Sequence, residues 1–329
     1  MKSTYFTTAF WQQKTYAWGL CIGILSGMLW GLNNSLFARG YALFPVSKFS
    51  QTLDAFSLAM YLPVVCAAIN DICAASALLI FNGTRGVLAI VKRHLFTKSG
   101  MFVCLAALLG GPIGQSSYFL GITFAGPSTA LIITATYPII GCILSYFFLH
   151  QKITLKMWIG IFLSVLGAIL VGYTPEEGDY SYFPLGILCA SLAAFCWGSE
   201  VVLSYYGMND MDPDIAITLR ECISGGVLLF TVCITGNFFI LKELLKYTSG
   251  TFLLSGAGVI AGFSYFLWYA ANKQIGCARG MAANSTYVIW GVMCNTLYMG
   301  LHSISIQVLV GCLCVMIGVI LVSLNSTET

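Results

Sequence analysis

Residues 186–203 read Gly-Ile-Leu-Cys-Ala-Ser-Leu-Ala-Ala-Phe-Cys-Trp-Gly-Ser-Glu-Val-Val-Leu, an apolar run with a single acid, Glu200. The surrounding stretch is long enough to cross a bilayer, because a spanning helix needs about 20 mostly apolar residues. A carboxyl group near the bilayer centre costs roughly 2.5–3.5 kcal/mol on insertion scales, so such residues usually mark a substrate or ion path. Trp197 precedes Glu200 by about one helical turn, which puts both side chains on nearly the same face. A carboxylate beside an aromatic ring is a suitable partner for an organic cation.

The composition extends this interpretation to the whole chain. Of 329 residues, 58% are hydrophobic and 8% charged, and the mean hydropathy is +0.87, whereas soluble domains carry about 25% charged residues. We therefore expect a polytopic all-α membrane protein whose partners include membrane lipids and exclude nucleic acid. The 13 cysteines show no metal-ligand spacing and the 3 histidines form no pair on one helix face. No metal, cofactor or catalytic residue is expected, which disfavours the alternative of an intramembrane enzyme acting on lipid.

Hydropathy predicts ten transmembrane helices. Most of the 15 lysines and arginines fall on the side of the N-terminus, and the positive-inside rule then places both termini in the cytoplasm. The predicted segments are 16–37, 58–80, 101–122, 129–149, 157–173, 183–206, 214–239, 250–271, 277–299 and 304–324.

Short motifs recur in the same order in the two halves of the chain. The matching runs are Trp30-Gly31 with Trp197-Gly198, Ser117–Leu120 with Ser264–Leu267, and Thr136-Tyr137 with Thr286-Tyr287. We predict two repeats, residues 1–173 and 174–329, of five helices each. Because five is odd, the second copy enters the membrane from the opposite side, which makes a 5+5 inverted repeat, an arrangement typical of secondary transporters. An insertion at residues 41–57 has no counterpart in the second repeat and is expected to form a short interfacial helix.

Glycine patterns make two structural predictions. The run Gly110-Gly111-Pro112-Ile113-Gly114 is expected to bend or loosen the third segment and to free backbone polar groups. Gly160 with Gly167, and Gly311 with Gly318, are two helical turns apart and form smooth stripes that allow close helix packing in lipid. The stripes suit either a scaffold within one chain or a dimer contact, so both a monomer and a homodimer stay open.

Four ionisable residues fall within the predicted spans: Asp71, Glu200, Arg220 and Glu221. Three acids against one base suit a cationic cargo better than an anionic one. Because buried charges must be paired, we expect Arg220 to form a structural pair with one of its acidic neighbours, Glu221 or Asp71. Glu200 has a neutral counterpart, Asn33, in the first repeat, which makes it the preferred substrate or proton site. Asp71 and Glu221 are further proton-coupling candidates, whereas the bland alternative is a protonated Glu200 bonded to backbone or a tyrosine.

Aromatic residues accompany these acids. Taken singly, each would be interpreted as packing or as part of an interfacial belt. Taken together with a nearby acid, they form a cage for a quaternary ammonium group. The predicted substrate-binding residues are Trp30, Trp197, Glu200, Tyr118, Tyr137, Tyr287 and Trp290.

The chain resembles the EamA-type drug/metabolite transporter superfamily in three features: ten segments, a repeat of five plus five segments, and a glycine stripe in the last segment of each half. Several runs further resemble the LicB-type bacterial choline permeases. The resemblance implies a transporter, not an enzyme, in the bacterial inner membrane that imports choline or a related quaternary ammonium compound with proton coupling. The alternative is an EamA-type exporter of amino acids, metabolites or drugs. The runs that carry the narrower resemblance are Leu29-Trp30-Gly31, Gly111–Gly114, Tyr137-Pro138, Phe147–Ile153, Gly186–Ala190, Trp197–Glu200 and Tyr287–Trp290.

Overall fold

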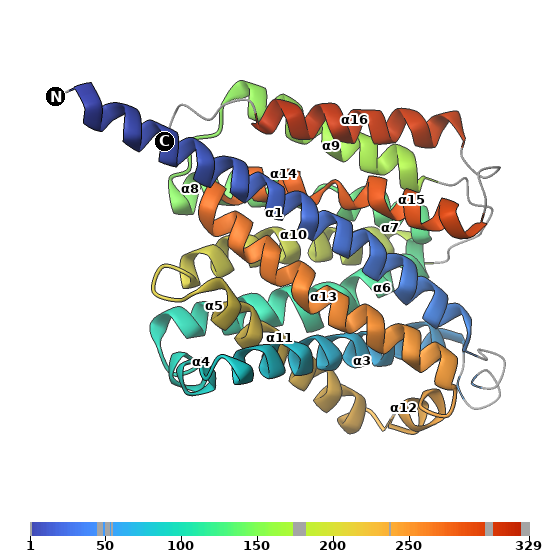
Figure 1. Ribbon diagram of the computed structural model, residues 1–329. Helices are drawn as coiled ribbons and strands as arrows, with labels where there is room; N and C mark the ends of the chain where they lie inside the picture. The colour runs from blue at the N-terminus through green and yellow to red at the C-terminus, as the bar shows by residue number, and fades with distance from the viewer. Residues whose placement is uncertain are drawn as a thin grey trace.

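The protein is a bundle of long membrane-spanning helices (Figure 1). A computed structural model describes residues 2–44, 49, 53, 55–173, 182–236, 238–299 and 305–323. Over these residues nine helices are long and apolar enough to cross a membrane, which confirms the predicted all-helical membrane fold. Seven of these spans are single helices: α1 (Lys2–Ala42), α3 (Ala55–Thr84), α9 (Leu155–Gly172), α10 (Phe183–Gly207), α11 (Pro213–Ile234), α13 (Thr248–Ile275) and α16 (Ile306–Ser323).

The third span is interrupted where the glycine run predicted it. Helix α5 (Lys98–Leu108) passes through a single π-helical turn, η1 (Leu109–Ile113), into α6 (Gly114–Ala125). Pro112 lies inside this turn, and proline removes a backbone donor and clashes with the preceding helical turn. The carbonyl of Gly110 accepts a hydrogen bond from the indole Nε1 of Trp197 at 3.0 Å. The predicted loosening of the helix is therefore confirmed, and a neighbouring helix satisfies the exposed carbonyl.

Two further segments, predicted as continuous helices, are broken in the middle. Helix α7 (Pro127–Thr134) is followed by α8 (Tyr137–Leu149), and α14 (Cys277–Asn284) by α15 (Tyr287–Met299). Threonine hydroxyls donate to carbonyls at both breaks: Thr136 to Ile133 O at 2.6 Å and Thr286 to Ala283 O at 2.8 Å. Such side-chain bonds satisfy backbone groups that water cannot reach. Hydropathy did not reveal these breaks, because each segment is apolar enough on average to be predicted as a single span.

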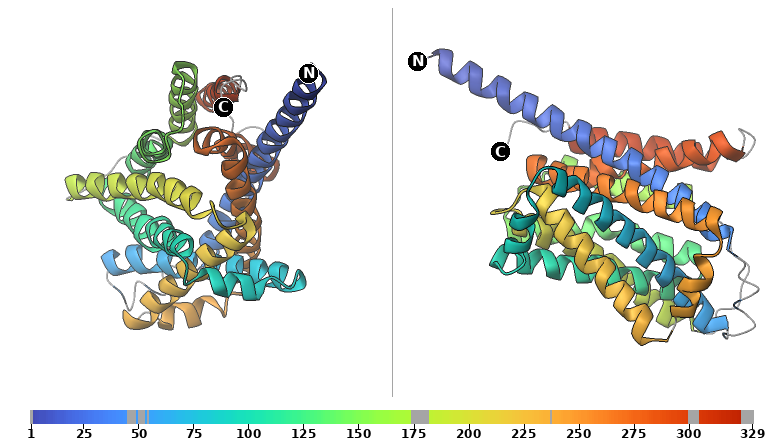
Figure 2. Two further views of the ribbon diagram at one scale, coloured as in Figure 1. Left: turned by 90° about the vertical axis from the view of Figure 1, so that its left-hand side faces the viewer. Right: turned by 60° about the horizontal axis from the view of Figure 1, so that its bottom comes forward.

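Helices of one half of the chain pack against helices of the other half. Helix α1 packs against α13 and α15, and α10 packs correspondingly against α6 and α8, while α3 packs against α11. The views in Figures 1 and 2 show α9 and α16 lying side by side along one edge of the bundle.

The glycine stripes of α9 and α16 face each other within one chain. A Cβ atom added at Gly160 would lie 2.6 Å from the carbonyl oxygen of Gly318, and one at Gly167 would lie 2.5 Å from that of Gly311. Backbone contacts this close require glycine on both helices. Within the described structure these stripes therefore serve the scaffold.

The connections hold three features that hydropathy missed. The long linker after α3 contains a short helix, α4 (Leu88–His94), and the helix predicted to reach residue 239 ends at Ile234, followed by α12 (Phe238–Leu244). In the insertion at 41–57, the described Phe44 and Phe49 are buried. Phe44 packs edge-on against Tyr247, with ring centroids 6.4 Å apart. Residues 41–42 of the predicted interfacial helix belong to α1 and residues 55–57 to α3, whereas residues 45–48, 50–52 and 54 lie outside the described residues.

Candidate functional site

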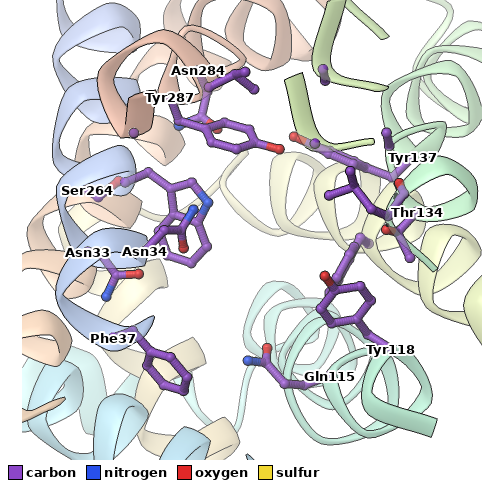
Figure 3. A pocket seen from close by; sticks show the side chains of 18 of the residues that line it. Asn33, Asn34, Phe37, Gln115, Tyr118, Thr134, Tyr137, Ser264, Asn284 and Tyr287 are labelled. Atoms are coloured by element: carbon purple, nitrogen blue, oxygen red, sulfur yellow. Dashed lines mark hydrogen bonds between the residues drawn. The ribbon is translucent and has the colours of Figure 1, made fainter. Parts of the chain in front are cut away.

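A cavity of about 570 Å³ lies between the two halves of the bundle. In Figure 3, Asn33, Asn34 and Phe37 project from α1 on one side, and Tyr118 and Tyr137 face them from the other. Tyr287 points across the space between them. The cavity is lined by α1, α3, α6, α9, α10 and α13 and by both broken helices. Broken helices that line a cavity are typical of transporter binding sites.

Two tryptophan–tyrosine pairs form aromatic walls. Trp30 of α1 packs on Tyr265 of α13 with ring centroids 4.9 Å apart, and Trp197 of α10 packs on Tyr118 of α6 at 5.4 Å. Tyr137 meets Trp197 edge-on, with centroids 6.4 Å apart and an interplanar angle of 85°. All five rings line the cavity. Each tryptophan therefore faces a tyrosine of the other half.

Glu200 lies in the same wall, only 3% exposed. Its Oε1 accepts a hydrogen bond from Arg220 Nε at 2.8 Å. The idea that Arg220 neutralises only Asp71 or Glu221 and leaves Glu200 without a basic partner is therefore wrong. The error arose because Arg220 lies on a different helix, α11, and sequence spacing does not reveal distances between helices. Glu200 nevertheless borders the cavity, and its Oε2 lies against Gly110, where an added Cβ would meet it at 1.8 Å.

Arg220 is the centre of a buried charge cluster formed with Glu200, Glu221 and Asp71. Its Nη1 lies 2.8 Å from Glu221 Oε1 and 3.8 Å from Asp71 Oδ2. Ser224 Oγ donates to Asp71 Oδ2 at 2.6 Å. Three carboxyl groups thus surround one guanidinium, and full ionisation would leave the cluster with a net charge of −2. Asp71 and Glu221 lie behind the cavity wall, outside its lining.

The π-helical turn provides the space for this cluster. Gly110 abuts Glu200, and a Cβ atom at Gly111 would lie 1.8 Å from Ser224 Oγ. Any side chain at either position would push the charged groups away. The glycines that weaken the helix are therefore the residues that let the third span approach the carboxylates closely.

Of the other predicted binding residues, Tyr287 lines the cavity and Trp290 does not. Trp290 lies one helical turn further along α15 and turns its Cβ toward α1, where it would contact a Cβ atom at Gly31 at 2.9 Å. Its proximity to Tyr287 in sequence was misleading, because the cavity reaches only one side of α15. The structure thus places Trp290 in helix packing, outside the lining.

The sequence interpretation missed a set of neutral polar side chains in the lining. They come from α1, α3, α6, both broken helices and α13, and in an apolar span an amide is the signal that could have found them. Asn33 Nδ2 donates to Ala257 O at 2.8 Å and Asn284 Nδ2 to Ser26 Oγ at 2.9 Å. The missed lining residues are Asn33, Asn34, Asn70, Gln115, Thr134, Ser264 and Asn284.

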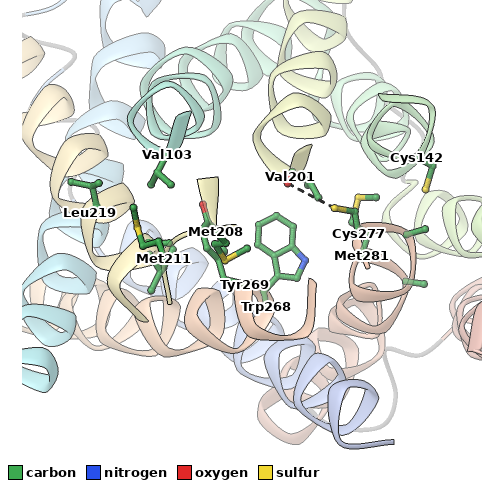
Figure 4. Packing of buried hydrophobic residues seen from close by; sticks show 14 of the residues in the cluster. Val103, Cys142, Val201, Met208, Met211, Leu219, Trp268, Tyr269, Cys277 and Met281 are labelled. Atoms are coloured by element: carbon green, nitrogen blue, oxygen red, sulfur yellow. Dashed lines mark hydrogen bonds between the residues drawn. The ribbon is translucent and has the colours of Figure 1, made fainter. Parts of the chain in front are cut away.

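The cavity extends toward one end of the bundle. Its α1 lining runs from Trp30 to Phe37, toward the helix end at Ala42, and α9 contributes only residues from Ala168 to its own end. At the opposite end a hydrophobic cluster fills the interior (Figure 4), with Met208, Trp268 and Met281 among its buried members. The cavity is therefore closed on one side.

Polar bonds tie the two halves together at this closed end. Arg85 pairs with Asp214, and Asn82 Nδ2 donates to Thr218 Oγ1 at 2.7 Å. The backbone N–H of Cys277 donates to Gln151 Oε1 at 3.1 Å. All these bonds join a residue before position 174 to one after it, so closure at this end is a contact between the halves.

A membrane bundle with a central cavity, broken helices and closure at one end defines a transporter of small molecules. The chain belongs to the EamA-like transporter family, whose sequence profile matches residues 17–173 and again residues 184–324. It is similar to the protein LicB of Haemophilus influenzae, with 25% identity over 83% of this chain and 87% of that protein. It is also similar to an uncharacterized transporter of Methanothermobacter thermautotrophicus, with 27% identity over 70% of this chain and 69% of that protein.

The fold is also similar to that of a solved crystal structure. It matches with a TM-score of 0.69 at 14% sequence identity and covers 93% of this chain and 98% of the other. At this identity the match supports the fold alone.

Proposed function

We propose that this transporter imports choline or a related quaternary ammonium compound by alternating access, in a bacterial inner membrane with both termini in the cytoplasm. The observation that carries the proposal is the wall around Trp197. Tyr118 and Tyr137 flank its ring, and Glu200, one helical turn away, borders the same cavity. Aromatic faces around a desolvated carboxylate are the chemistry that recognises a quaternary ammonium group.

The energetics support a site of useful affinity. A desolvated cation–π contact contributes about 2 kcal/mol, and the three rings of this wall supply up to three such contacts. Together with the Glu200 charge they approach the roughly 8 kcal/mol of a micromolar site. The cation also gains about 2.3 kcal/mol per 100 mV on entering a negative cell.

The open and closed ends of the bundle indicate where the cargo would enter the cavity and where it would leave. With the N-terminus in the cytoplasm, the cavity extends toward the outside and the hydrophobic cluster closes the cytoplasmic side. Rocking of the two predicted repeats would break bonds such as Arg85–Asp214 and open the inner side. The surplus of carboxyl groups around Arg220 provides sites for a proton that travels with the cargo, with Glu200, Asp71 and Glu221 as its candidate carriers.

The alternative is an EamA-type exporter of an amino acid, metabolite or drug. One observation favours it: amides such as Asn34 and Gln115 line much of the cavity, and its volume of about 570 Å³ accommodates a cargo with more hydrogen-bonding groups than choline has. Fold alone does not distinguish the two, since one fold serves many substrates.

Uptake of radiolabelled choline into proteoliposomes that contain the purified transporter tests the proposal. We expect saturable uptake that tetramethylammonium inhibits and that an inward proton gradient accelerates. Saturable transport of an amino acid, with choline inert as a competitor, would instead support the alternative.

Glu200→Gln tests the site itself and should abolish choline uptake. The matched control is Glu243→Gln, because Glu243 pairs with Lys246 in an exposed ion pair at the end of the bundle. Normal uptake by the Glu200 variant would remove this carboxyl from the mechanism.

A further inference from the structure

Arg220 lies directly behind the cavity wall and occupies two of the groups that a cargo cation would use. It is 2% exposed and bonds to Glu200 Oε1 at 2.8 Å. Its guanidinium carbon lies 4.8 Å from the ring centroid of Tyr265. Both Glu200 and Tyr265 line the cavity. The protein's own cation is thus held by the same carboxylate-and-aromatic chemistry that suits a quaternary ammonium cargo.

A second set of anionic partners lies on the other side of Arg220. Glu221 Oε1 is already bonded to Nη1 at 2.8 Å, and Asp71 Oδ2 lies 3.8 Å from the same nitrogen. Neither carboxyl lines the cavity. Ser224 holds Asp71 in place through its bond to Oδ2. A small shift of the guanidinium would therefore exchange Glu200 for Asp71 and keep Arg220 paired, while the Glu200 carboxylate becomes available to the cavity.

We infer that Arg220 is a resident competitor of the cargo, and that cargo binds at Glu200 when Arg220 transfers its ion pair from Glu200 to Asp71. Arg220 and Asp71 are then positioning residues that set the affinity for the cargo without touching it. The inference rests on the proposed transport of an organic cation.

The physical reason is charge repulsion in a medium of low dielectric constant. Two cations that share one buried carboxylate repel each other strongly, because water does not screen them. A cargo cation meets the full charge of Glu200 only in the arrangement in which Arg220 has moved. Binding therefore selects that arrangement, and its energy difference lowers the observed affinity. A neutral isostere of choline, 3,3-dimethylbutan-1-ol, cannot drive the exchange.

Equilibrium binding of radiolabelled choline to the full-length protein in lipid nanodiscs tests the inference. Arg220→Gln removes the competitor, and we expect binding to become about tenfold tighter, within the usual range of coupling between two ligands. Asp71→Asn removes the receiving carboxylate, and we expect binding about tenfold weaker. In the double variant Asp71→Asn should have no further effect, because Asp71 acts only through Arg220. In all variants 3,3-dimethylbutan-1-ol should compete poorly.

Arg93→Gln is the control for loss of one positive charge, since Arg93 is exposed on the short helix α4, and it should leave choline affinity unchanged. Weaker binding by Arg220→Gln would overturn the inference, because a purely structural Arg220 predicts that sign. An equal effect of Asp71→Asn with and without Arg220 would overturn it as well.

Asp71→Asn keeps Arg220 and its bonds to Glu200 and Glu221, so this variant is informative even where Arg220→Gln does not fold. Unchanged choline affinity in Asp71→Asn would overturn the inference by itself. Failure of the wild-type protein to bind choline or tetramethylammonium would overturn the proposed function together with it. Binding by the wild type, with variant effects of the opposite sign, would overturn only the role of Arg220.

Discussion

Two helix crossings form walls of the cavity, and they occupy corresponding places in the two predicted repeats. At one, Asn33 of α1 donates its amide to the backbone oxygen of Ala257 in α13 at 2.8 Å. At the other, Glu200 of α10 lies against Gly110, where the third span forms a π-helical turn. The partner of the amide is a continuous helix, and the partner of the carboxylate is an interrupted one.

The difference shows what a buried charge demands of its surroundings. A single backbone carbonyl satisfies the amide nitrogen of Asn33, so its neighbour keeps regular helical geometry and a methyl side chain. Glu200 needs a cationic partner, Arg220, and a neighbour without a side chain, because buried ions are costly unless they are paired and hydrogen-bonded. The π-turn supplies that space, and the indole of Trp197 bonds to the carbonyl of Gly110.

Adding a methyl group at the charged crossing should have the largest effect. Gly110→Ala would place a Cβ atom 1.8 Å from Glu200 Oε2 and force the carboxylate out of its position. The cargo then loses its charge partner, and losing one partner of a buried charge pair at a binding site costs about 2–5 kcal/mol, so we expect choline binding to weaken by about 100-fold or more. Gly256→Ala on α13 is the control, because its Cβ atom would meet nothing within 4 Å. Unchanged affinity in Gly110→Ala would show that Glu200 needs no such space.

Placing a carboxylate at the neutral crossing should be next in size. Asn33→Asp keeps the shape of the side chain but turns an acceptor toward the carbonyl of Ala257, which loses the Nδ2 donor of Asn33, and the new carboxylate oxygen finds no donor there. An unsatisfied buried group costs about 1–3 kcal/mol, and we expect a clearly lower melting temperature in detergent. Asn34→Asp, at an exposed lining position of the same helix, should melt like the wild type. Equal melting of both variants would mean that the two crossings tolerate charge alike.

Removing an indole N–H should lower the stability by a smaller amount, and more at Trp197 than at Trp30. Trp197→Phe keeps an aromatic ring but loses the bond to Gly110 O, which leaves a carbonyl of the π-turn without that donor. We expect a loss of about 1 kcal/mol of stability, visible as a lower melting temperature. Trp30→Phe, which changes the ring packed on Tyr265, is the paired measurement and should cost less. The opposite order would contradict the role assigned to the Trp197 indole.

The reverse exchange, Ala257→Gly, should have the smallest effect. It gives the neutral crossing the residue found at the charged one, and the cost is only the extra backbone freedom of glycine, about 0.5–1 kcal/mol in a helix. Choline affinity should stay at the wild-type value in the binding assay. A marked change in affinity would show that the neutral crossing also shapes the cargo site.

Local sequence rules predicted the helices well and their interruptions unevenly. The predicted segments 58–80 and 183–206 fall within α3 and α10, because lipid leaves the backbone no partner except its own helix. The interruption at Gly110–Gly114 was predicted because glycine and proline announce it. The breaks before Tyr137 and Tyr287 were not predicted. At the first, Pro138 in the opening turn of α8 is a signal that was not used, because proline removes a backbone donor from a helix interior. At the second no proline or glycine marks the break, and only the recurrence of Thr-Tyr pointed to it.

The lining of the cavity was predicted where chemistry is rare in a membrane and missed where it is common. An acid or a tryptophan in an apolar span stands out, so Trp197 and Glu200 were singled out from sequence. Gln115 and Asn34 were not, because an amide in an apolar span shows that it needs a polar partner but does not show toward which neighbour it points. Trp290 was included wrongly for the same reason, because its face depends on how α15 packs against α1.

By itself the sequence determined that this chain is a helical membrane protein with acids buried in its spans, because hydropathy is a property of each segment alone. The tertiary structure decided that Glu200 pairs with Arg220 and that Asp71 lies 3.8 Å from the same guanidinium, outside the cavity lining. Those pairings depend on distances of a few ångströms between α3, α10 and α11, which are set by where glycines let helices approach. Coulomb energy varies with such distances, whereas the hydropathy of a segment does not.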